Sequence, residues 1–265
     1  MTELHAPALL DPQELAVTQT VEPADLRRLL RLLAEENCVH SWRNFGVEGT
    51  VDDLLAWENR RRSTKIFFFY GRCGSESRLV GAGAVADQLT GEFPNPGFCV
   101  LSRCYIVPEF RGHGMYRPLL HYRMEYCRKE FGDALNGIHI GSAQDRVARV
   151  LFDHRLPGWP MFAHLGEEEL RVSGAGTMVG AYMVLMPRYV QRIERELAGS
   201  GAPASVVELR RTLAGIGAEP VRGLGLLVQR ARDDASAAGW FRERGSEAID
   251  QFLLFCRSIP LVWMT

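Results

Sequence analysis

The chain has 265 residues, of which 46% are hydrophobic and 24% are charged. This is enough for a globular protein with its own apolar core, and it excludes wholesale disorder. The 31 basic and 32 acidic residues give a formal charge of -1, so no basic excess favours a nucleic-acid partner. The lysines are only Lys65 and Lys129, which argues against a polybasic membrane tether.

Six cysteines are scattered along the chain without a Cys-x-x-Cys pair, so we expect neither a zinc site nor a disulfide framework. The first residues lack the basic and apolar regions of a secretory signal. The longest apolar stretches, residues 66–70 and 183–186, are too short to span a bilayer. We therefore expect a metal-free protein in a reducing cytoplasm, without a membrane span.

The first part of the chain predicts helices. Residues 1–21 show weak patterning and are expected to be loosely ordered. Leucines recur at helical spacing from Pro23, and a second amphipathic segment covers residues 51–62. Trp42 lies between these helices, in a stretch whose side chains are suited to binding a substrate, and it is a candidate acceptor-site residue. The alternative is that it is an aromatic residue of the core.

Strand and helix patterns then alternate. Two apolar strands separated by a turn predict a hairpin over residues 65–72 and 79–86. A strand, a helix, a strand and a helix are expected next, over residues 98–107, 115–131, 137–142 and 145–155. A helical crossover of this length makes the two strands that it joins parallel neighbours.

The last part of the chain predicts one more strand and then only helices. The strand covers residues 177–186, and Glu167–Glu169 is interpreted as a loop or the start of a helix. Helices are expected over residues 188–198, 205–214, 223–232 and 246–256. We therefore expect one domain over residues 22–187 and a helical extension over residues 188–265.

The residues most informative about function, 105–116, join a strand to a helix through a glycine loop. Gly112 and Gly114 let the backbone turn tightly and approach a ligand with no Cβ in the way. The loop and the first helical turn present unpaired N–H groups where the helix dipole is positive, and Arg111 adds a positive charge. This combination suits a diphosphate. It is neither a Walker loop, which ends in Gly-Lys-Ser/Thr, nor a dinucleotide fingerprint, which needs a glycine where Arg117 stands.

The segment resembles the acyl-CoA signature of the Gcn5-related N-acetyltransferase (GNAT) superfamily, Arg/Gln-x-x-Gly-x-Gly/Ala after a Val-x-Pro strand end. Val107, Pro108, Arg111 and Gly114 match it. The order of the predicted elements over residues 22–187 also matches that fold. The resemblance implies an α/β (α+β) fold, with a mixed, mostly antiparallel central sheet, a parallel and splayed strand pair, flanking helices and, here, C-terminal helices.

The resemblance also implies an activity, which is transfer of an acyl group, most simply acetyl, from acyl-CoA to the amine of a small molecule by direct attack. Backbone groups of Ile106 and Val107 would pair with the pantetheine arm of the donor. The diphosphate of the donor would be held by the loop residues Arg111, Gly112, His113, Gly114, Met115 and Tyr116. The co-substrate would be acetyl-CoA or another acyl-CoA, without a metal.

Two positions depart from the superfamily pattern, and the general base is a separate question. Tyr116 stands where the motif has Gly or Ala, so its ring either points to solvent or narrows the donor channel. Phe152 stands where the superfamily often has a Tyr that protonates the leaving thiolate. A thiolate can also leave unprotonated, because thiol pKa values lie near 8.5.

His139 is the candidate general base, since histidine titrates near neutral pH. The alternative is that His139 is a hydrogen-bonded histidine within the sheet.

A second resemblance leaves alternatives open. Ser102 and Arg103 match the Glu-x-Ser-Arg element of acyl-homoserine lactone and long-chain N-acyl amino acid synthases, which share the fold, while Val100 stands at the Glu position. This resemblance implies a long acyl thioester donor, an acyl carrier protein as partner, and an Arg103 that binds a carboxylate acceptor.

A third hypothesis is that the chain is a degenerate member of the superfamily, which binds CoA, or nothing, and serves as a scaffold. The apolar C-terminal helices would pack on the core or across a homodimer.

Overall fold

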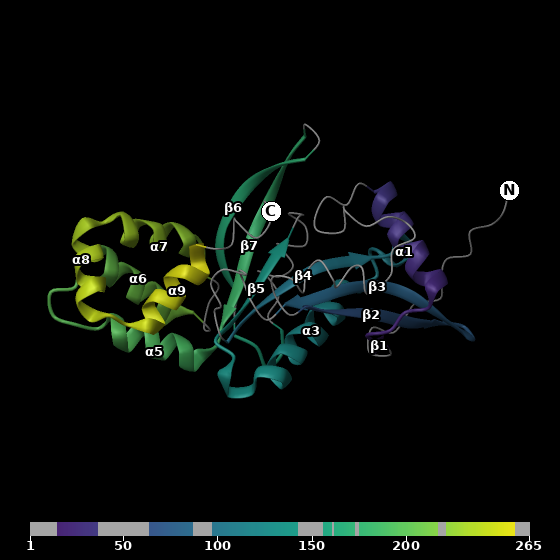
Figure 1. Cartoon of the computed structure of the whole chain (residues 1–265), viewed down its shortest axis with the longest axis horizontal. Helices are drawn as coiled ribbons and strands as arrows, with labels where there is room; N and C mark the ends of the chain where they lie inside the picture. Colours follow the sequence, from purple (N-terminus) through teal and green to yellow (C-terminus); the bar gives the residue numbers. More distant parts are fainter. Residues whose placement is uncertain are drawn as a thin grey trace. The chain divides into compact units, whose positions relative to one another are not determined.

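The fold is described from a computed structural model, and the described residues are 15–36, 64–86, 97–142, 156–160, 162–172, 175–216 and 221–257. The predicted helices over residues 51–62 and 145–155 lie outside them. The chain forms two compact units, one of residues 1–87 with 101–130 and the other of residues 88–100 with 131–265. Figure 1 labels the elements of both units.

The first unit contains the hairpin that the sequence predicts. Its strand order is β1 (Ala16–Thr18), β2 (Thr64–Cys73), β3 (Glu76–Ala86) and β4 (Phe98–Ile106), whose first residues belong to the second unit. β2 and β3 pair antiparallel and turn at Gly74, whose φ of 66° favours glycine. β1 pairs antiparallel with β2, so these residues form a strand where loose structure was expected.

Helices α1 (Pro23–Glu35) and α3 (Tyr116–Phe131) belong to this unit and confirm two predicted helices. Residues 66–69 of β2 are at most 2% exposed, which is typical of a strand buried on both faces. The rings of Phe67 and Phe69 lie edge-on to Tyr122 of α3, with centroids 5.5 and 5.7 Å away. An apolar face of α3 therefore packs on the hairpin.

The second unit begins in β4 and has the strand order β4, β5 (Gly137–Ser142), β7 (Ala175–Leu185) and β6 (Ala163–Val172). β7 pairs antiparallel with both β5 and β6. The carbonyl of Gly97, just before β4, accepts hydrogen bonds from the amides of Asn136 and Gly137 at 2.6 and 3.2 Å, where β5 begins. β4 and β5 therefore start side by side and run parallel, as the crossover through α3 predicts. This is the mixed, mostly antiparallel arrangement that the resemblance implied.

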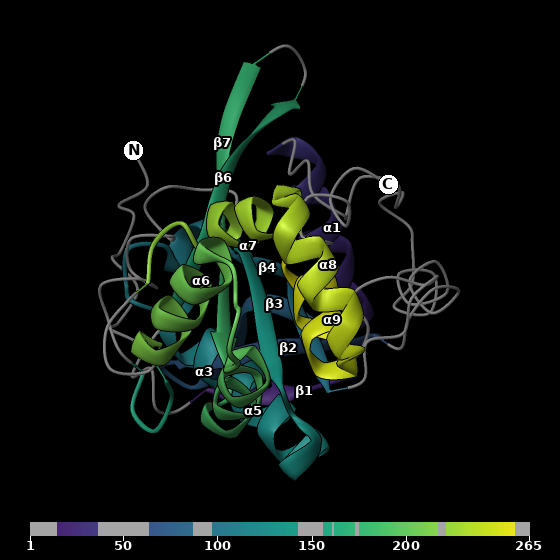
Figure 2. The ribbon, with the colours of Figure 1, turned by 90° about the vertical axis from the view of Figure 1, so that its left-hand side faces the viewer.

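Strand β6 corrects one expectation. Glu167–Glu169 lies within this strand, so the prediction of a loop or a helix start was wrong. Glutamate is depleted in strands, and the local pattern has no alternation, so the signal for a strand is absent from the sequence. Pairing with β7, which places Glu168 opposite Val179, overrides that local preference. Figures 1 and 2 both show the β6–β7 hairpin extending past the end of β5.

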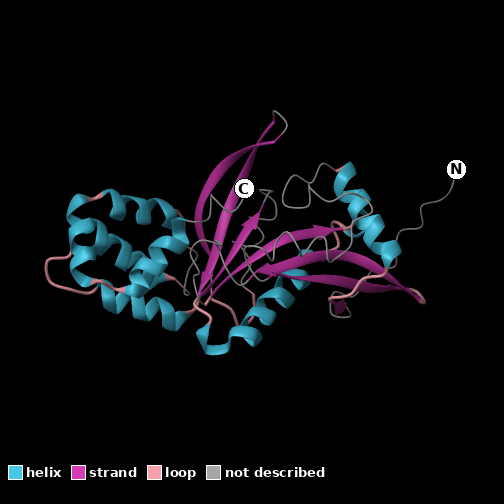
Figure 3. Cartoon of the chain, in the orientation of Figure 1, coloured by secondary structure: helices cyan, strands magenta, loops and turns pink. Residues whose placement is uncertain are grey.

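The elements described after β7 are all helices, drawn in cyan in Figure 3. The described helices are α5 (Pro187–Leu197), α6 (Ala204–Gly215), α7 (Leu224–Asp233), α8 (Ala235–Arg244) and α9 (Glu247–Arg257). All but α8 confirm predicted helices. The sequence of α8 carries Gly239 and weak periodicity, and this helix depends on the side chain of Asp234, which accepts hydrogen bonds from two amides of its first turn. The predicted domain boundary at residue 187 stays a prediction.

An aromatic cluster joins two of these helices to the sheet of the second unit. The ring of Phe98, the first residue of β4, lies with its centroid 4.2 Å from that of Phe255 in α9 and 5.2 Å from that of Tyr189 in α5. Phe98 and Phe255 are at most 1% exposed and Tyr189 is 2% exposed. The C-terminal helices therefore share an apolar core with the start of the central strands.

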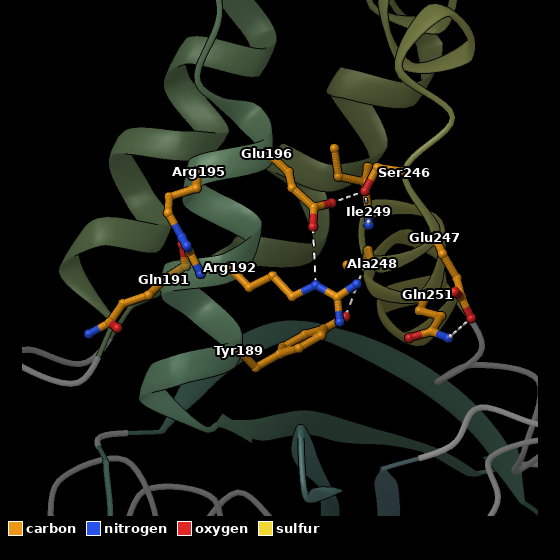
Figure 4. Close-up of polar contacts among 10 residues, drawn as sticks. All are labelled: Tyr189, Gln191, Arg192, Arg195, Glu196, Ser246, Glu247, Ala248, Ile249 and Gln251. Atoms are coloured by element: carbon orange, nitrogen blue, oxygen red, sulfur yellow. Dashed lines mark hydrogen bonds and ion pairs between the residues drawn. The ribbon is translucent and has the colours of Figure 1, made fainter. Parts of the chain in front are cut away.

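Polar contacts tie α5 directly to α9, as Figure 4 shows. The Tyr189 hydroxyl donates to the carbonyl of Ala248 at 3.0 Å, and burial raises the pKa of this phenol, which keeps it protonated as a donor. The carboxylate of Glu196 accepts hydrogen bonds from Arg192 on its own helix and from the hydroxyl of Ser246, just before α9. These contacts fix the two helices against each other.

Candidate functional site

Two glycines with left-handed backbone angles shape the loop between β4 and α3. It begins with a short 3-10 helix, η2 (Pro108–Phe110). Gly112 and Gly114 have φ angles of 81° and 74°, in the left-handed region that favours glycine. A Cβ at either position would meet nothing within 4 Å, and both residues are exposed. Backbone conformation, not crowding by neighbours, is therefore what requires glycine at these two positions.

The amides of this loop provide a set of hydrogen-bond donors. Among the described residues, the backbone N–H groups of residues 112–116 donate to no protein acceptor, and the next bond runs from Arg117 back to the Gly114 carbonyl. Positive φ at alternate residues is a backbone conformation in which successive N–H groups can face a common anion, an arrangement known as a nest. The N-terminus of α3 adds the positive end of a helix dipole.

Arg111, the first residue after η2, contacts Ile106, Glu36 and Tyr105. Its Nε donates to the carbonyl of Ile106 at 2.9 Å, and its Nη2 lies 2.6 Å from a carboxylate oxygen of Glu36, the residue that follows α1. Its guanidinium carbon lies 5.1 Å from the centroid of the Tyr105 ring. Arg111 therefore supplies the predicted positive charge, but part of its donor capacity is engaged by the protein.

A second ion pair lies beside this one. Glu109 in η2 accepts from Arg28 of α1 at 2.5 Å and from Arg78 of β3 at 3.3 Å. Sequence reasoning did not identify Arg28, Glu36 or Glu109. The opposite charges of Glu109 and Arg111 could be noticed in the sequence. Their partners Arg28 and Glu36 lie 81 and 75 positions away and Arg78 lies 31 positions away, so only the fold brings them together.

The backbones of β3 and β4 approach each other closely near the end of β4. The amide of Val107 donates to the carbonyl of Val80 at 2.9 Å, and the carbonyl of Val107 accepts from the amide of Phe110 at 2.9 Å. A ligand could therefore use only the second lone pair of the Val107 carbonyl. A Cβ at Gly81 would lie 2.3 Å from the Tyr105 carbonyl oxygen and 3.3 Å from the Cα of Ile106. The carbonyl of Ile106, one of the backbone groups that the resemblance assigns to the donor, accepts the hydrogen bond from Arg111.

The other predicted residues of the loop differ in exposure. His113 is exposed, whereas the side chain of Met115 is 1% exposed and anchors the loop in the core of the first unit. Tyr116 is half-buried, and burial raises the pKa of its phenol, so this group stays protonated at neutral pH. Its side chain is therefore not simply a solvent-exposed ring.

His139 lies in the second unit, on β5 opposite Met183 of β7. Its side chain is 0% exposed, and its ring lies edge-on to that of Phe255, with centroids 6.5 Å apart. The sequence predicts that His139 lies in a strand. The structure shows in addition that Phe255 of α9 packs against its ring. Its role as a base stays a prediction.

The remaining candidate residues are not placed in the site. Trp42 and Phe152 lie outside the described residues, and for Ser102 and Arg103 only the backbone, within β4, is described. Across the described ranges there is no group of side chains that could bind a metal ion, and no helix there is long and apolar enough to cross a membrane.

Comparison with protein-family profiles and with curated proteins finds no match. Solved structures similar to this chain include a spermidine N-acetyltransferase from Vibrio cholerae in complex with CoA and spermine. It has 19% sequence identity and a TM-score of 0.47, over 65% of this chain and 96% of that chain. A dodecameric structure of spermidine N-acetyltransferase from Vibrio cholerae has 18% identity and a TM-score of 0.48, over 68% and 98% of the two chains.

The fold itself is shown by the elements of the chain. An antiparallel meander leads into β4, a glycine loop and helix α3 follow, and α3 crosses to the parallel neighbour β5. These are the features that the resemblance implied, in the same order. The chain therefore has the fold of the Gcn5-related N-acetyltransferases.

Proposed function

We propose that this chain is an acyl-CoA-dependent N-acyltransferase, most simply an acetyltransferase, that acts on the amine of a small molecule. The observation that carries the proposal is the row of amides over residues 112–116, which donate to no acceptor in the part of the chain that the structure describes, at a loop that contains two left-handed glycines. A diphosphate carries acceptor oxygens and negative charge at a spacing that such a nest recognises. Acetyl-CoA or another acyl-CoA is the co-substrate.

Within this proposal the residues have separate tasks. The amides of the loop and the charge of Arg111 bind the diphosphate. The carbonyl of Ile106 accepts a hydrogen bond from the pantetheine arm, and so does the second lone pair of the Val107 carbonyl, whose first accepts from Phe110. The acceptor amine attacks the thioester carbonyl directly, so the nitrogen–carbon bond forms and the carbon–sulfur bond breaks. His139 stays the candidate that removes the proton of the amine. Its burial requires the amine to reach it within the protein or through a water relay.

The test compares two glycines that have the same backbone geometry. Gly114 and Gly201 have φ angles of 74° and 75°, and a Cβ at either would meet nothing within 4 Å. Alanine costs each of them about 1–2 kcal/mol of conformational energy. Only Gly114→Ala also reshapes the proposed nest, so we expect it to lose at least tenfold in affinity for CoA. Gly201→Ala should bind CoA like the wild type.

The measurement is calorimetric titration of the full chain with CoA, acetyl-CoA and a long-chain acyl-CoA. Binding of acetyl-CoA that weakens in Gly114→Ala supports the proposal. Tighter binding of the long-chain thioester instead supports the alternative, a fatty-acyl transferase, with an acyl carrier protein as partner. If no thioester and no CoA binds to the wild type, the chain is a non-catalytic scaffold and the proposal is wrong.

A further inference from the structure

Two ion pairs of opposite sense connect α1 to the loop. Arg28 on α1 pairs with Glu109 at 2.5 Å, and Glu36, eight positions further along, pairs with Arg111 at 2.6 Å. Eight residues rise by roughly 12 Å along a helix, so the two contacts lie about that far apart, one within α1 and one just past its end. α1 contributes the cation Arg28, the residue after α1 contributes the anion Glu36, and the loop contributes their complements.

The pair between Glu36 and Arg111 engages groups that the proposed function assigns to the donor. While Arg111 contacts Glu36, its Nε also donates to the carbonyl of Ile106, at 2.9 Å. The guanidinium is the charge expected to meet the diphosphate, and the carbonyl is the acceptor expected to meet the pantetheine arm. In this conformation, the Arg111 side chain engages both groups on which donor binding depends, namely its own guanidinium and the Ile106 carbonyl.

We propose that Glu36 is a positioning residue that sets the affinity for the acyl donor, because its carboxylate competes with the diphosphate for Arg111. This inference rests on the proposed function. The side chains of Arg111 and Glu36 are 46% and 29% exposed, and a pair this exposed contributes little net free energy. A diphosphate, which offers more negative charge and several acceptor oxygens, displaces the carboxylate, and Arg111 then leaves the Ile106 carbonyl. The ion pair between Arg28 and Glu109 keeps α1 attached during this exchange.

The test is the affinity of full-length variants for CoA, measured by titration calorimetry. Glu36→Gln removes the competing charge, and we expect it to bind CoA about two- to fivefold more tightly than the wild type. Glu35→Gln is the matched control, because Glu35 is exposed, lies one residue earlier and has no ion pair with a described residue. It should leave the affinity unchanged. In an Arg111→Gln background, Glu36→Gln should have no further effect, since the competition needs the guanidinium.

The direction of the change separates this role from a structural one. Loss of a contact that only supports the fold lowers the melting temperature and weakens CoA binding together, whereas relief of competition tightens binding whatever happens to stability. Equal or weaker binding by Glu36→Gln overturns the inference while leaving the proposed function intact. The same holds if the effect persists without Arg111. A wild type that binds no CoA refutes the proposed function itself, and the inference with it.

Discussion

The close approach of β3 and β4 predicts that Gly81→Ala will be strongly destabilising. A Cβ at Gly81 would lie 2.3 Å from the Tyr105 carbonyl oxygen, and the Cα of Ile106 and a methyl of Leu119 would each be 3.3 Å away. An ordinary contact between carbon and oxygen is roughly 3.3 Å, so the two strands must separate by about 1 Å. The nearest atom belongs to the backbone, and no side-chain rotation relieves the contact.

The magnitude follows from two opposed terms. Overpacking of a well-packed region costs about 1–3 kcal/mol, and a backbone clash of this size belongs to the upper half of that range. Replacing glycine in a strand recovers about 0.5–1 kcal/mol, because alanine has less conformational freedom to lose on folding. We therefore expect Gly81→Ala to lower the free energy of unfolding by about 2 kcal/mol. The end of β4 should also shift, so the affinity for CoA should fall.

Urea denaturation followed by circular dichroism measures the first effect, and CoA titration measures the second. Gly83→Ala is a graded control on the same strand, because its Cβ would lie 3.0 Å from the side chain of Arg123, which can move more readily than a backbone carbonyl. It should destabilise less than Gly81→Ala. A free energy of unfolding for Gly81→Ala within about 0.5 kcal/mol of the wild type would refute the reasoning.

Two further predictions concern α8. A Cβ at Gly239 would meet nothing within 4 Å, so Gly239→Ala should raise the free energy of unfolding in urea by about 0.5–1 kcal/mol, and a decrease would show that the helix needs glycine there. The hydrogen bond from the Ser205 hydroxyl, 2.6 Å long, holds the pKa of Asp234 below its usual value near 3.8. A carboxyl with a lowered pKa in the folded state contributes stability above the unfolded pKa, and that contribution is lost as the pH falls. Asp234→Asn, which keeps a capping acceptor, should therefore melt at a lower temperature than the wild type at pH 7 but similarly near pH 2–3. An equal difference at both pH values would contradict the role of the charge.

Several elements were predictable because their signals are local. The leucines after Pro23 repeat at helical spacing, and the apolar strands around Gly74 are separated by turn residues, so α1 and the β2–β3 hairpin follow from patterns within about ten positions. The two glycines of the loop were also informative, since a left-handed φ is the conformation that favours this residue. The fold class and the candidate donor loop thus come from short-range periodicity and one motif.

The features that could not be predicted depend on distant partners. β6 is a strand because β7 pairs with it, against the preference of Glu167–Glu169. The contact between Glu36 and Arg111 joins positions 75 residues apart, and no pattern within either segment marks it. His139 has the local sequence of a strand residue, while its burial beneath Phe255 depends on how α9 returns to the sheet.

By itself, then, the sequence predicted the turn between β2 and β3, all the described α-helices except α8, and the glycine loop after β4. These properties depend on the conformational preferences of single residues and on short hydrophobic periods. The tertiary structure alone decided which charges meet and which side chains are buried, namely that Arg111 contacts Glu36 and that His139 is enclosed. Such contacts arise between segments far apart in the chain, and their energies depend on geometry that local sequence does not encode.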